Sequence, residues 1–191
     1  MQESRPNQRG FTLVEVMIAI LIFGVGLLAV ASLQGVARKA SYEAVQRTTA
    51  THLAESLLER MRANPRGLGT YVASAVVWQG AAPGGDPAAC TTTATACSPA
   101  GMAAADLAQW WDLVEGSTET VDGAPVGGLV QPTVCLRSTT GGITGAYTVA
   151  IAWRGASEVD QTGADPCGAA GTHDYGNFRR VIVLNSYINA L

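Results

Sequence analysis

The stretch that decides the fold lies near the N-terminus and reads Arg9-Gly10-Phe11-Thr12-Leu13-Val14-Glu15-Val16-Met17-Ile18-Ala19-Ile20-Leu21-Ile22-Phe23-Gly24-Val25-Gly26-Leu27-Leu28-Ala29-Val30-Ala31. From Phe11 to Ala31, 21 residues contain a single ionisable side chain, Glu15. A helix of this length measures roughly 31 Å, which is enough to cross the hydrocarbon core of a bilayer. The sequence therefore predicts a transmembrane helix over residues 11–31.

Glu15 is the unusual feature of this span. A charged group inside a membrane is costly and usually marks function, so the carboxylate needs a partner. It lies in the first turns of the expected helix, where the helix dipole favours negative charge. We expect Glu15 to take part in the assembly of several copies of such a helix, because an unpaired buried carboxylate would be strongly disfavoured.

A polar decapeptide with two arginines precedes the span and meets it abruptly at Gly10-Phe11. The apolar run is longer than that of a secretory signal peptide. The Gly-Phe-Thr-Leu-Val-Glu pattern over residues 10–15 resembles the processing site of type IV prepilins and pseudopilins. The resemblance implies that a prepilin peptidase cleaves between Gly10 and Phe11, removes the leader 1–10 and methylates the new Phe11 amine. It also implies a partner for Glu15, namely the positive amine of another subunit.

The helical pattern continues beyond the span. Apolar residues recur at spacings of three and four over residues 32–63, with charges between them, so we predict one helix from Phe11 to about Ala63. Asn64 before Pro65 is a stop signal. Gly24 and Gly26 interrupt good helix formers. They provide either flexibility during assembly or close helix packing, and the sequence favours neither interpretation.

Charge and cysteine placement predict the compartment. The chain has 191 residues, of which 14% are charged, and a formal net charge of −3. Residues 63–191 are acidic, with five arginines against ten acids, which argues against a nucleic-acid-binding surface. All four cysteines follow the span, as expected in an oxidising compartment. We expect the leader 1–10 to be cytoplasmic and the head, residues 64–191, to be periplasmic.

The head is predicted to be α+β. We expect strands at Tyr71–Gln79, Leu129–Arg137, Ala146–Trp153 and Phe178–Ile188, and a helix over Gly101–Glu115 that buries a tryptophan, Trp110 or Trp111. The last three strands read as an antiparallel meander. The predicted fold class is therefore a type IV pilin-like α+β fold, in which a long N-terminal helix packs on a small antiparallel sheet.

The cysteines favour disulfides over a metal site. No Cys-x-x-Cys pair and no nearby histidine is present, so neither a metal nor another cofactor is expected. Four cysteines permit three connectivities. The preferred pairing joins Cys90 to Cys97 and Cys135 to Cys167. The acids of the loop 157–177, Asp160, Asp165 and Asp174, are expected to be solvated, because their spacing fits no calcium loop.

The C-terminal part narrows the family. Residues 148–155 and 175–189 are similar to the minor pilins called PilV, or type IV pilus modification proteins. This resemblance implies a low-abundance subunit that initiates, assembles or tips the pilus. Its implied partners are other minor and major pilins, the prepilin peptidase/N-methyltransferase, the inner membrane and the pilus assembly platform. It also implies a single-pass protein of the inner membrane that is incorporated into the pilus at the cell surface.

Three alternatives remain open. A type II secretion minor pseudopilin shares the whole N-terminal argument. A tip adhesin or DNA-uptake pilin would need an exposed aromatic or basic patch, and Arg179-Arg180 is a small cluster. An anchored enzyme is least favoured. His52 and His173 accompany no nucleophile motif, phosphate loop or paired carboxylates, so no catalytic residue is predicted.

Overall fold

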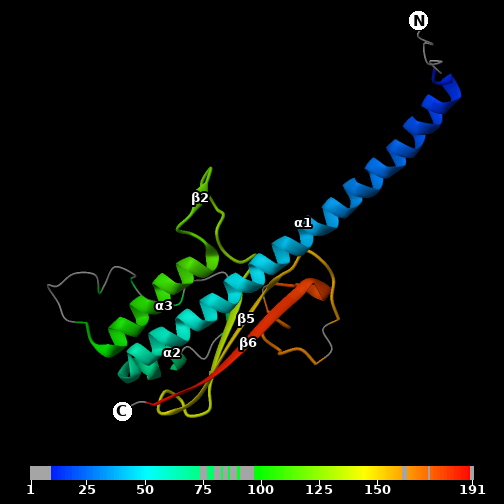
Figure 1. Cartoon of the computed structure of the whole chain (residues 1–191). Coiled ribbons are helices and arrows are strands. Elements are labelled where there is room, and N and C mark those ends of the chain that lie inside the picture. Colours follow the sequence, from blue (N-terminus) through cyan, green and yellow to red (C-terminus); the bar gives the residue numbers. More distant parts are fainter. Residues whose placement is uncertain are drawn as a thin grey trace, which may run out of the picture. The chain divides into compact units, whose positions relative to one another are not determined.

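The computed structural model describes residues 10–73, 77–79, 83, 86, 90, 97–160, 163–171 and 173–189. The chain divides into two compact units, Met1–Ser41 and Tyr42–Leu191. The helix α1, Leu13–Ala63, begins in the first unit and ends in the second (Figure 1). Within the described part of the chain it is the only helix long and apolar enough to cross a membrane. Of the predicted leader, residues 1–9 lie outside the described residues.

The second unit contains the remaining elements. In chain order they are η1 (Pro65–Gly67), α2 (Leu68–Ala73), β1 (Val77–Gln79), α3 (Pro99–Glu115), β2 (Thr120–Val121), β3 (Ala124–Pro125), β4 (Thr133–Ser138), β5 (Gly145–Arg154), η2 (Gly176–Phe178) and β6 (Arg179–Ile188). Helix α1 ends at Ala63, as predicted from the sequence, because Asn64 precedes Pro65, the first residue of η1.

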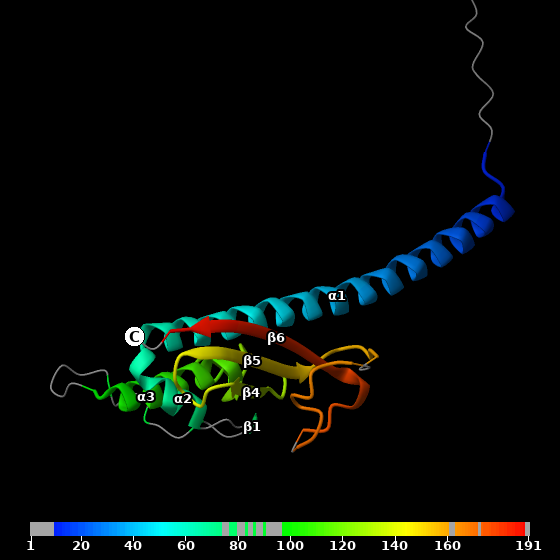
Figure 2. The same cartoon turned by 90° about the horizontal axis from the view of Figure 1, so that it is seen from below.

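The main sheet has the strand order β1-β4-β5-β6, and each neighbouring pair is antiparallel. This confirms the meander of the last three strands and the α+β class. The β5–β6 register runs without a break from Gly145 opposite Ile188 to Arg154 opposite Arg179. Figure 2 shows β6 at one end of the sheet, next to the 42–63 part of α1. Strand β4 begins later than predicted, since Pro132 has no N–H to donate to the ladder.

The predicted strand Tyr71–Gln79 is wrong over its first part. Residues 68–73 form the helix α2, Val77–Gln79 are extended, and residues 74–76 lie outside the described residues. Leu68, Tyr71 and Val72 are buried, and their spacing of three and four is that of one helix face. Residues 71–79 have a high β-propensity, which suggested a strand. Residues 68–73 are helical instead because their apolar face packs against α3.

The core lies between the sheet and two helices. Its α1 side is formed by alanine, leucine and methionine side chains. Trp110 and Trp111 of α3 are both fully buried, whereas the sequence predicted burial of one of them. Helix α3 begins at the N-cap Ser98, whose hydroxyl accepts from the Gly101 N–H, with Pro99 in the first turn. It ends at Gly116 in the left-handed conformation, where a Cβ would lie 2.0 Å from the Gly128 nitrogen.

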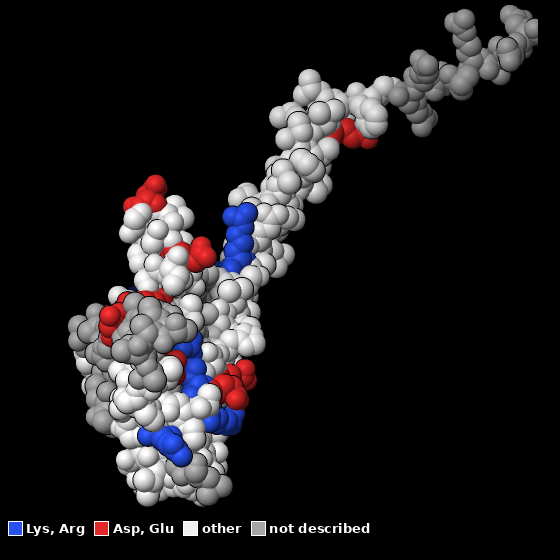
Figure 3. Space-filling model, turned by 90° about the vertical axis from the view of Figure 1, so that its left-hand side faces the viewer, with Lys and Arg blue, Asp and Glu red and all other residues white. Residues whose placement is uncertain are grey.

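A small hairpin, β2–β3, follows α3. Its two turn residues, Asp122 and Gly123, have positive φ angles of 51° and 80°, the combination that a two-residue hairpin of type I′ requires. Figure 3 shows acidic atoms at the tip of this projection.

Candidate assembly site

The predicted cleavage site lies at the start of α1. Gly10 and Phe11 precede the helix, and Phe11 is 86% exposed. In Figure 3 the helix surface is mostly white, with an acidic patch near its N-terminal end and a basic patch further along. Between Phe11 and Ala31, Glu15 is the single acid in the sequence. This part of the chain therefore offers a nearly uncharged surface that carries one carboxylate.

Thr12 and Glu15 form a capping box at this helix end. The Glu15 N–H donates to the Thr12 hydroxyl at 3.3 Å, and the Thr12 N–H donates to Glu15 Oε2 at 3.4 Å. The Thr12 hydroxyl also donates to Oε2 at 3.3 Å. Each residue thereby satisfies a backbone N–H of the other, as in a Ser/Thr-x-x-Glu box. This role of Thr12 was not predicted, although the Thr-x-x-Glu pattern before an apolar run indicates a capping box.

An apolar groove lies beside Glu15. It has a volume of about 570 Å³ and is lined by Phe11, Glu15, Val16, Ala19, Ile20 and Phe23. These side chains recur at spacings of three and four, so they share one helix face with the carboxylate. Such a face can receive an apolar helix only if the carboxylate is neutralised by a cation.

Gly24 and Gly26 lie within the continuous helix α1. A Cβ at either position would meet nothing within 4 Å, so both glycines leave the helix surface open to a neighbour. Neither position has a backbone conformation that demands glycine. Their expected role in helix flexibility therefore stays a prediction.

A carboxylate clamp joins residues 42–63 of α1 to the sheet. Glu43 accepts from Arg180 of β6 through both oxygens, at 2.8 Å from Nε and 2.7 Å from Nη2. It also accepts from the Ser157 hydroxyl at 2.7 Å and from the Ser157 N–H at 2.9 Å. Burial alone would raise the pKa of the Glu43 carboxyl, but the Ser157 and Arg180 contacts outweigh it, and the pKa lies below its usual value.

A second polar cluster joins α1, α2 and α3. Arg60 Nη1 contacts Asp106 Oδ1 at 3.0 Å, and the Tyr71 hydroxyl donates to Asp106 Oδ2 at 2.5 Å. Burial, followed by the adjacent Asp106 carboxylate, raises the pKa of Tyr71, so this hydroxyl stays a donor. Trp110 Nε1 donates to the Leu53 carbonyl at 2.9 Å. The second half of α1 is therefore bound to the head by polar contacts as well as by packing.

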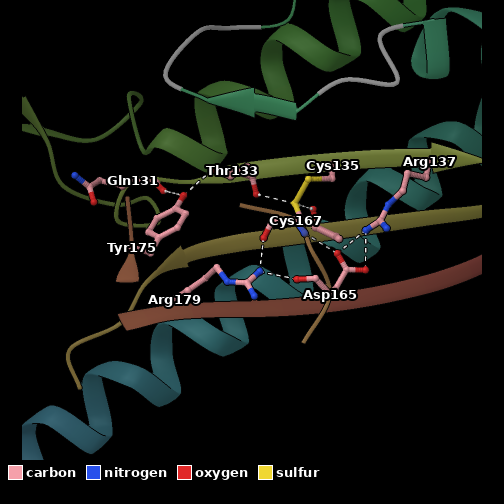
Figure 4. Close-up of a disulfide and its surroundings, with 9 residues drawn as sticks. Gln131, Thr133, Cys135, Arg137, Asp165, Cys167, Tyr175 and Arg179 are labelled. Carbon is pink, nitrogen blue, oxygen red and sulfur yellow. Dashed lines mark hydrogen bonds and ion pairs between the residues drawn. A yellow bond between two sulfur atoms is a disulfide. The ribbon is translucent and has the colours of Figure 1, made fainter. Parts of the chain in front are cut away.

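The cysteines are joined in the preferred pairing. Cys90 is bonded to Cys97, and Cys135 of β4 is bonded to Cys167 in the loop before η2 (Figure 4). Asp165 lies beside the second bond and was wrongly expected to be solvated. Its carboxylate accepts two hydrogen bonds from Arg137 Nη2 and one from the Cys167 N–H.

Arg179 completes the support of this loop. Its side chain is 6% exposed, and its Nη1 donates to the carbonyls of Asp165 and Cys167. Figure 4 shows Arg137 and Arg179 on either side of Asp165. Arg179-Arg180, the one basic pair of the head that could have suggested an anionic ligand, is thus engaged in structural contacts with the loop and with Glu43.

The described residues contain no group of three or more His, Cys, Asp or Glu side chains that could hold a metal ion. His52 is exposed on α1 and lies 3.6 Å from Glu55. His173 lies next to Tyr175, with 5.9 Å between ring centroids.

Comparisons with known proteins agree with this geometry. A family model described as Type IV pilin Tt1218 matches residues 32–108, and a model of the Prokaryotic N-terminal methylation motif matches residues 5–31. These matches support a type IV pilin. The long apolar helix followed by small antiparallel sheets is consistent with the α+β fold of that family. No curated protein and no solved structure matches the chain.

The methylation motif implies processing of the chain by a prepilin peptidase and incorporation with other pilins. Together with the apolar helix, it fits a membrane-anchored subunit that later enters a pilus. A pilin is a structural subunit, which suggests that the chain is not an enzyme.

Proposed function

We propose that this pilin is a minor subunit of a type IV pilus, of the PilV kind, which helps to initiate, assemble or tip the filament. The observation that carries the proposal is the start of α1, where one exposed carboxylate interrupts an otherwise apolar surface within the match to the methylation motif. The similarity of residues 148–155 and 175–189 to PilV proteins supports the minor-pilin assignment.

Cleavage between Gly10 and Phe11 creates the group that Glu15 needs. The new Phe11 amine carries a positive charge, and methylation by the same peptidase retains that charge. Among the described residues, the Glu15 carboxylate accepts from the Thr12 hydroxyl at 3.3 Å and from the Thr12 N–H at 3.4 Å, and both distances are long for hydrogen bonds. A charge-assisted bond to the ammonium of a neighbouring subunit is shorter and stronger. We infer that Glu15 exchanges the Thr12 cap for that ammonium on assembly.

The proposed topology follows the same scheme. Residues 1–10 are a cytoplasmic leader, residues 11–31 cross the inner membrane and later enter the filament core, and residues 32–63 continue the helix into the periplasm. The head, residues 64–191, is periplasmic, and its two disulfides suit an oxidising compartment. Gly24 and Gly26 allow the helix to loosen when it leaves the bilayer. The proposed partners are minor and major pilins and the assembly platform.

The deciding experiment measures the intact mass of the protein from membranes and from sheared surface filaments. We expect the loss of residues 1–10 plus one methyl group, with the processed protein present in sheared pili. The same processed mass confined to membranes would favour a type II secretion pseudopilin or a subunit that stays at the base. An unprocessed mass would refute the proposal. Retention on host-surface ligands or on DNA at physiological salt would instead support a tip adhesin or a DNA-uptake pilin.

A pair of variants tests the role of Glu15. Glu15→Ala removes both the cap and the charge, so we expect normal membrane insertion and impaired incorporation into pili. Thr12→Ala is the matched control, because it weakens the cap and keeps the carboxylate. We expect that control to be incorporated almost normally. Equal incorporation of Glu15→Ala and the unaltered protein would exclude the pairing.

A further inference from the structure

Among the described residues, the strand β6 forms one end of the main sheet and pairs on one side with β5. Edge strands are commonly blunted by charge, proline, bulges or short length. Residues 181–188 read Val-Ile-Val-Leu-Asn-Ser-Tyr-Ile, without charge or proline. The register with β5 has no bulge over ten residues. Such an edge is a template for pairing with another chain.

The pairing pattern identifies which backbone groups are on that edge. Gly155 N–H donates to the Phe178 carbonyl at 2.8 Å, and hydrogen bonding alternates along an antiparallel ladder. The even-numbered residues of β6 therefore bond to β5. The N–H and C=O groups of Val183, Asn185 and Tyr187 point to the opposite edge. These are the groups that an added strand would satisfy.

The open part of the edge is limited to residues 183–187. The loop covers the edge just before β6, since the Val159 N–H donates to the Asn177 carbonyl at 2.8 Å. Further along, Val183 is 39% exposed and Tyr187 is 69% exposed. A groove of about 380 Å³ lies between α1 and this part of β6, lined by Glu55, Leu58, Glu59, Arg62, Leu184 and Asn185. An added strand could place a side chain in it.

We propose that residues 183–187 of β6 accept an edge strand from the head of a neighbouring subunit of pilin fold. This inference rests on the proposed pilin function, because subunits anchored in one membrane stand side by side in the same orientation. The sheet has four alternating strands, so its two end strands, β1 and β6, run in opposite directions. If a neighbour has the same orientation, its strand equivalent to β1 would therefore run antiparallel to β6. This contact is heterologous, so it can continue along a filament.

A second copy related by a two-fold axis fits less well. If β6 of one copy paired antiparallel with β6 of another, residues 42–63 of α1 would run in opposite directions in the two copies. Both helices could then not enter the same membrane in one direction. Main-chain pairing instead favours a neighbour that contributes a different edge.

The test uses the full chain in cells that assemble the filament, with the photo-cross-linking residue p-benzoylphenylalanine in place of Tyr187. Filaments are sheared after illumination, and the adduct is identified by mass spectrometry of its peptides. We expect an adduct with an edge strand of another pilin head. The same residue in place of Val121, which is 59% exposed on the β2–β3 hairpin, is the control and should not give that adduct.

Val183→Pro removes one donor from the free edge and leaves the ladder to β5 intact. We expect it to lower the adduct yield about tenfold, the effect of losing one or two main-chain hydrogen bonds. Val183→Thr keeps the N–H and should leave the yield unchanged. If Val183→Pro does not fold, Val183→Lys protects the edge by charge instead.

Processed protein in filaments without a Tyr187 adduct would overturn the edge proposal and leave the pilin function standing. An adduct that Val183→Pro and Val183→Lys do not reduce would also overturn it. Unprocessed protein that never reaches filaments would overturn both.

Discussion

The two disulfides give a prediction that can be worked through in numbers. They close loops of very different length, with sequence separations of 32 for Cys135–Cys167 and 7 for Cys90–Cys97. A cross-link stabilises by restricting the unfolded chain, and the effect grows with the logarithm of the loop length. The chain-entropy relation gives about 3.7 kcal/mol for the long loop and about 2.5 kcal/mol for the short one at 25 °C.

Burial adds to this difference. Cys135 and Cys167 are 7% and 3% exposed and pack with Ala150, Ala152 and Tyr175. Replacing both by alanine also removes buried sulfur atoms, which costs packing free energy. For a head of this size, each kcal/mol shifts Tm by about 2–4 °C. We therefore expect Cys135→Ala/Cys167→Ala to lower Tm by at least about 2–5 °C more than Cys90→Ala/Cys97→Ala.

The assay is thermal unfolding of the full chain in detergent micelles, followed by the fluorescence of the buried tryptophans. Both double variants leave an intact second disulfide and no free thiol, so thiol labelling serves as the control for correct pairing. An equal or larger loss of Tm in Cys90→Ala/Cys97→Ala would refute the loop-entropy argument. It would mean that the contacts of Asp165 and Arg179 hold the long loop without the bond.

Three further predictions concern the head. Because the pKa of Glu43 is lowered, its ionised form stabilises the head above the unfolded pKa near 4.5, and this stability is lost as the pH falls through the lower folded value. Glu43→Gln should flatten that pH dependence in thermal unfolding; an unchanged profile would contradict it. Trp110→Phe removes the indole donor to the Leu53 carbonyl and should cost about 0.5–1.5 kcal/mol in urea unfolding, whereas no loss would show that this hydrogen bond contributes nothing to stability. Gly128→Ala would place a Cβ 2.2 Å from the Glu115 carbonyl carbon and should lower Tm, while Gly69→Ala meets nothing and should not; similar Tm values would exclude the close approach.

Much of the head was predictable, because its strands have local signals. Strand β5 alternates buried and less buried positions in its first half, and β5 and β6 agree with their predicted ranges to within one residue at each end. The helix α2 was not predictable in this way. Its run of β-favouring residues reads as a strand, and contact with α3 determines that it is helical.

The functional residues likewise divide into those with a local sequence signal and those that depend on tertiary contacts. Gly10, Phe11 and Glu15 stand out in the sequence, since one carboxylate in an apolar span is visible without coordinates. The cap from Thr12 was also readable from its spacing, although the apolar span drew attention to Glu15 alone. The partner of Glu43 could not be predicted from the sequence. A favourable pair with Arg47 is suggested by the i, i+4 spacing, but both carboxylate oxygens contact Arg180, 137 positions away.

The sequence by itself determined the long helix, its stop before Pro65 and the α+β class, because these depend on the periodicity and chemistry of neighbouring residues. Only the tertiary structure decided the clamp on Glu43, the support of the disulfide loop by Arg179 and the exposure of one edge of β6. Each of these depends on which strand lies at the end of the sheet and which side chains meet across it. Residues far apart in the chain make those contacts, and no local pattern records them.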